Sequence, residues 1–149
     1  MVFAARFINH AYAALLLAES GLMVEAITAE RSAVEALAAY RLLLADPNAS
    51  EEYHQGSFKK PVKVRERLEE LGYKNEAEAL KSIYSVQSGF AHMGRDHEKF
   101  SLQWESELEG RLQVGGVFKE EGLGQTIKIL TVLIGWFVSP LNDSKIQKI

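Results

Sequence analysis

Apolar residues recur along this chain with the spacing of α-helices, in blocks that glycine and proline separate. Five blocks with a period near 3.6 residues predict helices over residues 2–19, 22–46, 61–71, 75–93 and 119–138. Gly21 and Gly72 follow two of the predicted ends, where glycine is favoured, and Pro61 occupies a first helical turn. The connection at residues 47–56 is long enough for one further helical turn from Ser50.

The segment near residues 95–117 has a different pattern. Apolar and polar residues alternate there, which is typical of short strands or extended loop. The second predicted helix would be about 37 Å long at 1.5 Å per residue, so the shape should be elongated. We predict a single all-α domain over residues 1–149. It should be an elongated up-and-down bundle of four to five main helices with an irregular or β-hairpin-like insertion near 95–117.

Composition and charge narrow the class of protein. Apolar residues make up 47% of the 149 residues and there is no cysteine, which excludes a disulfide scaffold, a zinc-thiolate site and a thiol enzyme. The formal net charge of -3 does not favour nucleic-acid binding through a basic face. The apolar run at 127–141 is shorter than the roughly 20 residues of a membrane span. It predicts a buried core helix, no membrane association and a cytoplasmic location.

Arg31 is the clearest anomaly in the pattern. At 100° per residue it lies inside the apolar stripe of the second predicted helix, while Glu30 and Glu35 lie at its edges. A buried guanidinium is costly unless it is paired. We therefore expect Arg31 to meet a carboxylate or carbonyl from another helix. The alternatives are a structural ion pair, a side chain extending to water, or an arginine facing a ligand between helices.

A second group of polar residues lies on the fourth predicted helix. Tyr84, Ser88 and His92 follow one another at i, i+4 and i+8, which places them on one ridge. Nucleophilic catalysis would also need an orienting acid and an oxyanion site, and no nucleophile-elbow spacing is present. His92 is better explained as a residue that ends the helix and caps its carbonyls.

Metal binding has few ligands to draw on. The four histidines form no HExxH or HxxxH pair. His92 and His97, with Asp96 and a glutamate such as Glu30 or Glu35, are the weak candidates. We expect no cofactor. The basic residues at positions 59–67 are followed closely by acids, which is typical of a solvated helix face.

Two stretches of sequence resemble a known group. The first runs from Glu30-Arg31-Ser32 through Glu35 to Asp46-Pro47, and the second is the Tyr-x-x-x-Ser-x-x-x-His pattern that ends at His92. Together they resemble small uncharacterised helical prokaryotic proteins similar to the HEPN-like superfamily. That resemblance implies a helical bundle, a homodimer, and a link to defence or nucleic-acid metabolism. HEPN ribonucleases share an Arg-x(4–6)-His motif, which this chain lacks, since Arg6 and His10 have only three residues between them.

The leading hypothesis is therefore a HEPN-like binding or assembly module without the ribonuclease motif. The resemblance assigns Arg31, Glu35, Ser88 and His92 to a shared polar cluster, either ligand-binding or structural. One alternative is a hydrolytic or metal-assisted enzyme with a site built from Glu30, Glu35, His92 and His97. Another is a purely structural dimerisation bundle, which would leave a large apolar surface on the second or last helix.

Overall fold

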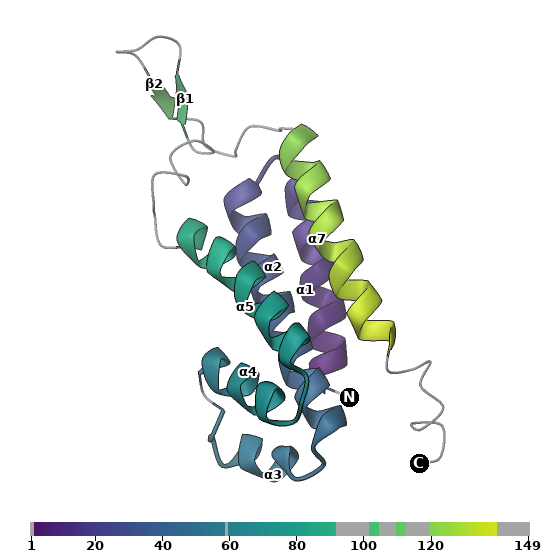
Figure 1. The fold of residues 1–149 in the computed structure, drawn as a ribbon. Helices are drawn as coiled ribbons and strands as arrows, with labels where there is room; N and C mark the ends of the chain where they lie inside the picture. Colours follow the sequence, from purple (N-terminus) through teal and green to yellow (C-terminus); the bar gives the residue numbers. More distant parts are fainter. Residues whose placement is uncertain (1, 59, 92–101, 105–109, 113–119, 140–149) are drawn as a thin grey trace.

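The computed structural model describes residues 2–58, 60–91, 102–104, 110–112 and 120–139, and helices make up most of them (Figure 1). The helices are α1 (Val2–Glu19), α2 (Met23–Ala45), α3 (Ala49–His54), α4 (Pro61–Glu70), α5 (Lys74–Ala91) and α7 (Glu120–Val138). The all-α prediction is confirmed. Within the predicted insertion, β1 (Leu102–Trp104) and β2 (Gly110–Leu112) pair antiparallel, and its other residues lie outside the described ones.

The helix ends follow local backbone chemistry. Gly21 and Gly72 have φ of 77° and 92°, the left-handed conformation that closes helices α1 and α4. Asp46 ends α2 in an extended conformation because Pro47 disfavours helical geometry in the residue before it. The Asp46 carboxylate then accepts a 3.0 Å hydrogen bond from the backbone N–H of Asn48, which starts the turn into α3.

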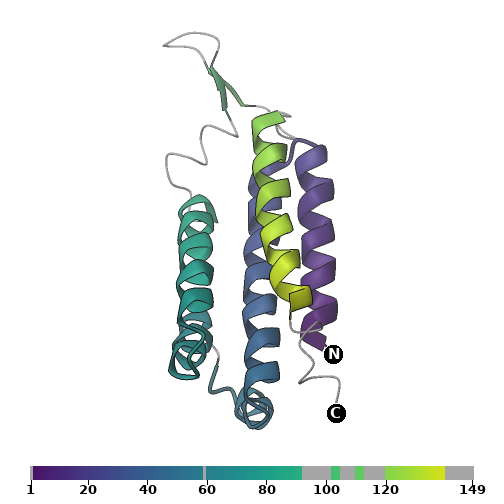
Figure 2. The same cartoon turned by 45° about the vertical axis from the view of Figure 1, so that its right-hand side comes forward.

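Helix α2 is the centre of the molecule. It packs against α1 and α7 on one side and against α4 and α5 on the other (Figure 2). The largest fully buried apolar side chains come from five helices: Phe7, Leu37, Leu42, Leu68, Leu80 and Leu133. Small residues let α1 and α2 approach closely, since alanine dominates the buried face of both. Because α2 is covered on several sides, most functional side chains of the core meet on it.

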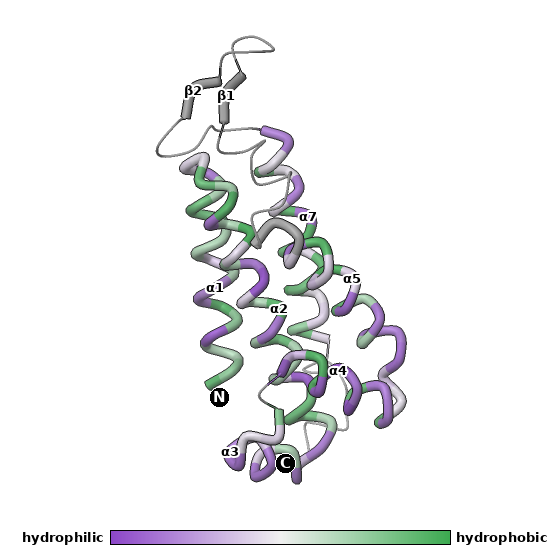
Figure 3. The backbone as a smooth tube through the Cα atoms, turned by 90° about the vertical axis from the view of Figure 1, so that its left-hand side faces the viewer, coloured by the Kyte–Doolittle hydropathy of each residue, from purple (hydrophilic) through white to green (hydrophobic). Residues whose placement is uncertain are grey.

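Helix α7 departs from the prediction of a buried core helix. Leu130 and Leu133 are buried, but Ile127, Ile134 and Val138 are exposed. The reason is that α7 packs along one flank only, on α1 and α2, and no described element covers its outer flank. In the hydropathy colouring α1 and α7 are largely hydrophobic, whereas α4 and α5 are mostly hydrophilic (Figure 3).

The same helix also meets a length and composition criterion for membrane spans. Among the described residues, Glu120–Val138 is the one helix long and apolar enough to cross a bilayer, and 22% of the tested window is buried in the fold.

Candidate functional site

A polar cluster lies where α2 meets α5. Arg31 Nη2 donates a 2.5 Å hydrogen bond to the hydroxyl oxygen of Tyr84, and Arg31 Nε lies 3.4 Å from Glu35 Oε1. The i, i+4 spacing of Arg31 and Glu35 puts both on one face of α2. Arg31 therefore takes its carboxylate from its own helix, and a hydroxyl, rather than the expected carboxylate or carbonyl, from another.

The Tyr84 ring binds a second guanidinium from α4. Arg31 Cζ lies 4.7 Å from the ring centroid and Arg65 Cζ lies 4.9 Å from it. Both distances are within the range of cation–π attraction. Tyr84 thus joins α2, α4 and α5 through one side chain. Arg65 makes no ion pair with a described residue, which distinguishes it from Arg31.

A small cleft opens to solvent beside this cluster. Its volume is about 100 Å³, and Glu35, Arg65 and Tyr84 supply its polar edge. Its walls are mostly apolar side chains from α2, α4, α5 and the α3–α4 connection: Val34, Ala38, Phe58, Pro61, Val64 and Leu80, with Tyr53 of α3. The cleft therefore combines a charged edge with apolar side chains in its walls, and polar atoms form the larger part of its exposed lining.

A second polar cluster is buried inside the bundle. Glu30 of α2, Gln87 of α5 and Thr126 of α7 are each 1% exposed. Gln87 Nε2 donates a 3.1 Å hydrogen bond to Glu30 Oε2, while Glu30 Oε1 and Gln87 Oε1 have no partner. Burial raises the pKa of the Glu30 carboxyl, and its polar contacts with Thr126 and Gln87 oppose this only in part. The geometry and the pKa direction both favour a protonated carboxylic acid in the folded protein.

Two arginine clamps fix the helices that form the cleft. Arg41 of α2 binds both carboxylate oxygens of Glu76 on α5, with Nε 3.0 Å from Oε2. Arg67 of α4 donates from Nε and Nη2 to Asp46 Oδ2, at 3.2 Å and 2.8 Å. The hydrogen bonds from Arg67 lower the pKa of Asp46 below its usual value. These contacts position α4 and α5 against α2 and so set the width of the cleft.

The structure brings some of the predicted site residues together but not all of them. Glu35 lines the cleft, and Arg31 pairs with it from the same face of α2. Ser88 is half-buried on α5, and its hydroxyl forms no hydrogen bond with a described residue. His92 and His97 lie outside the described residues. Glu30, expected at the edge of the apolar stripe, is instead fully buried, because α5 and α7 both cover its side of α2.

The sequence reasoning did not single out Arg65, Gln87 or Thr126. Gln87 could have been recognised from the sequence, because it lies among the apolar positions of its helix, as Arg31 does. Arg65 looked like one member of a solvated basic group, and Thr126 had no distinguishing signal. No group of three or more metal-ligating side chains occurs in the part of the chain that the structure describes. Glu30 and Glu35 face different neighbours, so the structure does not bring them into one site.

No family model, curated protein or solved structure matches this chain. The function must therefore be inferred from the chain's own geometry.

Proposed function

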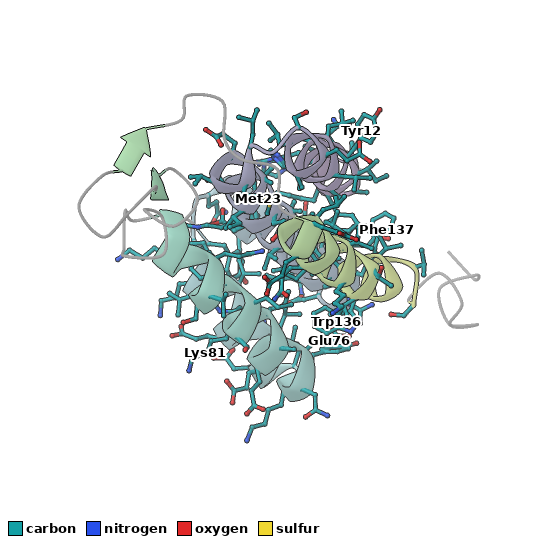
Figure 4. The ribbon with its side chains drawn as sticks, turned by 90° about the horizontal axis from the view of Figure 1, so that it is seen from above. Tyr12, Met23, Glu76, Lys81, Trp136 and Phe137 are labelled. Carbon is teal, nitrogen blue, oxygen red and sulfur yellow. The ribbon has the colours of Figure 1, made fainter. Side chains whose placement is uncertain are left out.

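We propose that this chain is a binding and assembly module that works as a homodimer, with the dimer interface on α1 and α7. The observation that carries the proposal is the pair of exposed apolar stripes on these neighbouring helices. On α1, Ile8, Tyr12 and Leu16 are exposed at i, i+4 and i+8. In the view from above, Tyr12 points away from the other helices, whereas Phe137 of α7 lies toward α1 (Figure 4).

The matching stripe on α7 has helical spacing too. Ile127, Ile134 and Val138 lie within about 40° of one another around the helix axis, and all are exposed. Because Phe7 of α1 stacks on Phe137 of α7 at 4.9 Å between centroids, the two helices hold each other in fixed positions. Exposed apolar patches of this kind are typical of interaction surfaces.

The size of this surface suits a second copy of the chain. Helices of 18 and 19 residues are about 27 Å long. At an axis spacing of ~9 Å, two helices side by side are about 18 Å wide, which gives a face of roughly 500 Å² in projection. Accessible area over side chains exceeds projected area, so the face approaches the roughly 800 Å² per partner of a standard interface. An interface of about 800 Å² per partner would cover less than a tenth of the 9802 Å² of surface that the chain exposes.

A lipid surface suits this face less well than a second copy. The net charge of -3 does not attract anionic headgroups. Helix α7 also begins with Glu120 and Glu121, buries Leu133 and packs the partly buried Phe137 against the core, so inserting it would undo that packing. The proposal therefore includes a cytoplasmic location without membrane association.

The HEPN-like relationship belongs to the same proposal. Its support is that the two resembling segments form α2 and α5, which pack on each other, and that the Asp46–Pro47 break ends α2. A module of this kind without the ribonuclease motif would act by binding rather than by cleavage.

The test is the oligomeric state in solution. Light scattering at micromolar concentration should give the mass of two 16.6 kDa chains, and the I134E variant should give one. The matched control is V86E, which places the same charge on an exposed apolar residue of α5, away from the proposed interface. V86E should remain dimeric. A monomeric wild-type chain, or an I134E variant that dimerises as V86E does, would refute the proposal. If the wild-type monomer also floats with neutral vesicles, the exposed face binds lipid instead of a second copy.

A further inference from the structure

The rim of the α2–α4–α5 cleft carries hydrogen-bond donors that no described residue uses. Arg65 lines the cleft, and its guanidinium has no carboxylate or carbonyl partner among the described residues. Tyr84 also lines the cleft, and its oxygen already accepts a hydrogen bond from Arg31. The hydroxyl proton of Tyr84 is then directed away from Arg31, and none of the described side chains accepts it. Two donors therefore border one cavity.

The charges at this rim favour an anion. Arg31 and Glu35 form an ion pair and nearly cancel, which leaves Arg65 as the uncompensated charge. Counting Arg31, which pairs with Glu35 from outside the lining, the charged groups at this edge of the cleft sum to one positive charge. Because planar guanidinium groups bind carboxylates through two parallel hydrogen bonds, a monocarboxylate complements Arg65 best, with the Tyr84 hydroxyl as an additional donor.

The interior of the cleft defines the rest of the ligand. Val34, Ala38, Val64 and Leu80 offer no polar side-chain atom, so the part of the ligand that contacts them should be apolar. The volume of about 100 Å³ is somewhat smaller than the roughly 150 Å³ cavity that accommodates a benzene ring. A short branched chain would fit inside, and an aromatic ring would fit in part, with its carboxylate at the open rim.

We propose that this cleft is a binding site for a small monocarboxylate with a short apolar or aromatic body, held by Arg65 and Tyr84. Arg31 acts as a positioning residue. It holds the Tyr84 hydroxyl, and its pairing with Glu35 reduces the repulsion that Glu35 would exert on an anion. This proposal is independent of the dimer, because no residue that lines the cleft comes from α1 or α7, which form the proposed interface.

Benzoate is a suitable probe, followed by backbone amide and arginine Nε–H shifts in NMR titrations of the full chain. A ligand of this size should bind at roughly millimolar affinity, and the shifts should centre on the cleft. R65Q should weaken benzoate binding by roughly tenfold or more, as expected for loss of a charge-assisted contact. R65K should recover part of the affinity. E35Q, which removes the negative charge from the rim, should tighten binding.

Two comparisons separate this site from non-specific attraction. R6Q removes an exposed arginine on α1, a helix that supplies no residue to the cleft lining, and should leave binding unchanged. Benzamide, which has the same shape without the charge, should bind at least tenfold more weakly than benzoate. A38M fills the apolar interior and should abolish saturable binding while thermal unfolding shows that the chain still folds. Equal benzoate affinity in R65Q and wild type, equal affinity for benzamide, or shifts outside the cleft would each overturn the proposal.

Discussion

The buried carboxyl of Glu30 should make the folded chain less stable as pH rises. Its side chain is 1% exposed, and burial raises its pKa above the ordinary value of 4.5. Between 4.5 and its folded pKa, the folded chain therefore holds a proton that the unfolded chain has released. The free energy of unfolding must fall with increasing pH in this window, by at most about 1.4 kcal/mol per pH unit for one proton. Below 4.5 the contribution is complete, and above the folded pKa it is lost.

The hydrogen-bond geometry gives an independent reason to expect a neutral acid. Glu30 Oε2 accepts from Gln87 Nε2, and the two atoms left without a partner are Glu30 Oε1 and Gln87 Oε1. Two oxygens cannot pair while the carboxylate is ionised. A proton on Oε1 supplies the missing donor, and the acid and the amide can then share two hydrogen bonds. Leaving a buried polar atom unpaired costs about 1–3 kcal/mol, so protonation is strongly favoured.

The E30Q variant tests this directly. Its amide is permanently neutral and can form the same pair of hydrogen bonds with Gln87. We expect urea unfolding of the wild-type chain to give decreasing stability above pH 4.5, and E30Q to lack that component. Subtracting the two curves removes the contributions of histidines and surface carboxylates. The matched control is E35Q, which changes an ion-paired glutamate on the same helix whose side chain is 39% exposed. E35Q leaves Glu30 in place, so the component of the pH dependence assigned to Glu30 should persist in it.

Two outcomes would refute the reasoning about Glu30. One is a wild-type stability that rises with pH relative to E30Q, which would mean that Glu30 is ionised and stabilising in the fold. The other is parallel curves for wild type and E30Q, which would mean that the carboxyl titrates alike in the folded and unfolded chains.

Three other predictions concern stability. The lowered pKa of Asp46 makes its contribution present above pH 3.8 and lost as pH falls through the folded pKa, so acid unfolding curves of D46N should lack that loss. L133A should cost about 2–5 kcal/mol in urea unfolding, whereas I134A, one residue along α7 and exposed, should cost far less; equal costs would contradict the assigned packing. G124A should raise stability by up to about 1 kcal/mol, because a Cβ there meets open space within a helix, while G72A should lower it because φ is 92°; the same sign for both would contradict this.

The sequence predicted the helices well because their signals are local. Pro61 begins α4 and Gly72 follows its end, as expected from the backbone preferences of these two residues. The Asp46–Pro47 pair ends α2 within one residue of the predicted boundary. Such signals depend on a few neighbouring residues, so one sequence is enough to locate them.

The same local patterns could not predict that Glu30 is buried. A helical wheel places Glu30 at the edge of the apolar stripe, but it does not say which helix covers that edge. Here α5 contributes Gln87 and α7 contributes Thr126, from 57 and 96 residues further along the chain. The position of Arg65 over Tyr84 depends equally on how α4 and α5 pack. Polar contacts across helices follow from tertiary geometry, which periodicity within one helix does not encode.

Helix α7 shows how the same limit applies to an apolar helix. Its composition favours burial on all sides. Among the described elements, however, only α1 and α2 pack against it, and they cover the one flank that carries Leu130, Leu133 and Phe137. Thr126 lies on that inner flank and contacts Glu30, so the neutral acid and the apolar contacts together hold α7 in place. The proposed dimer face around Ile134 depends on this inner flank staying docked. If the dimer forms as we propose, ionising Glu30 should weaken it, because the ionised carboxylate would loosen the packing that holds α7 in position.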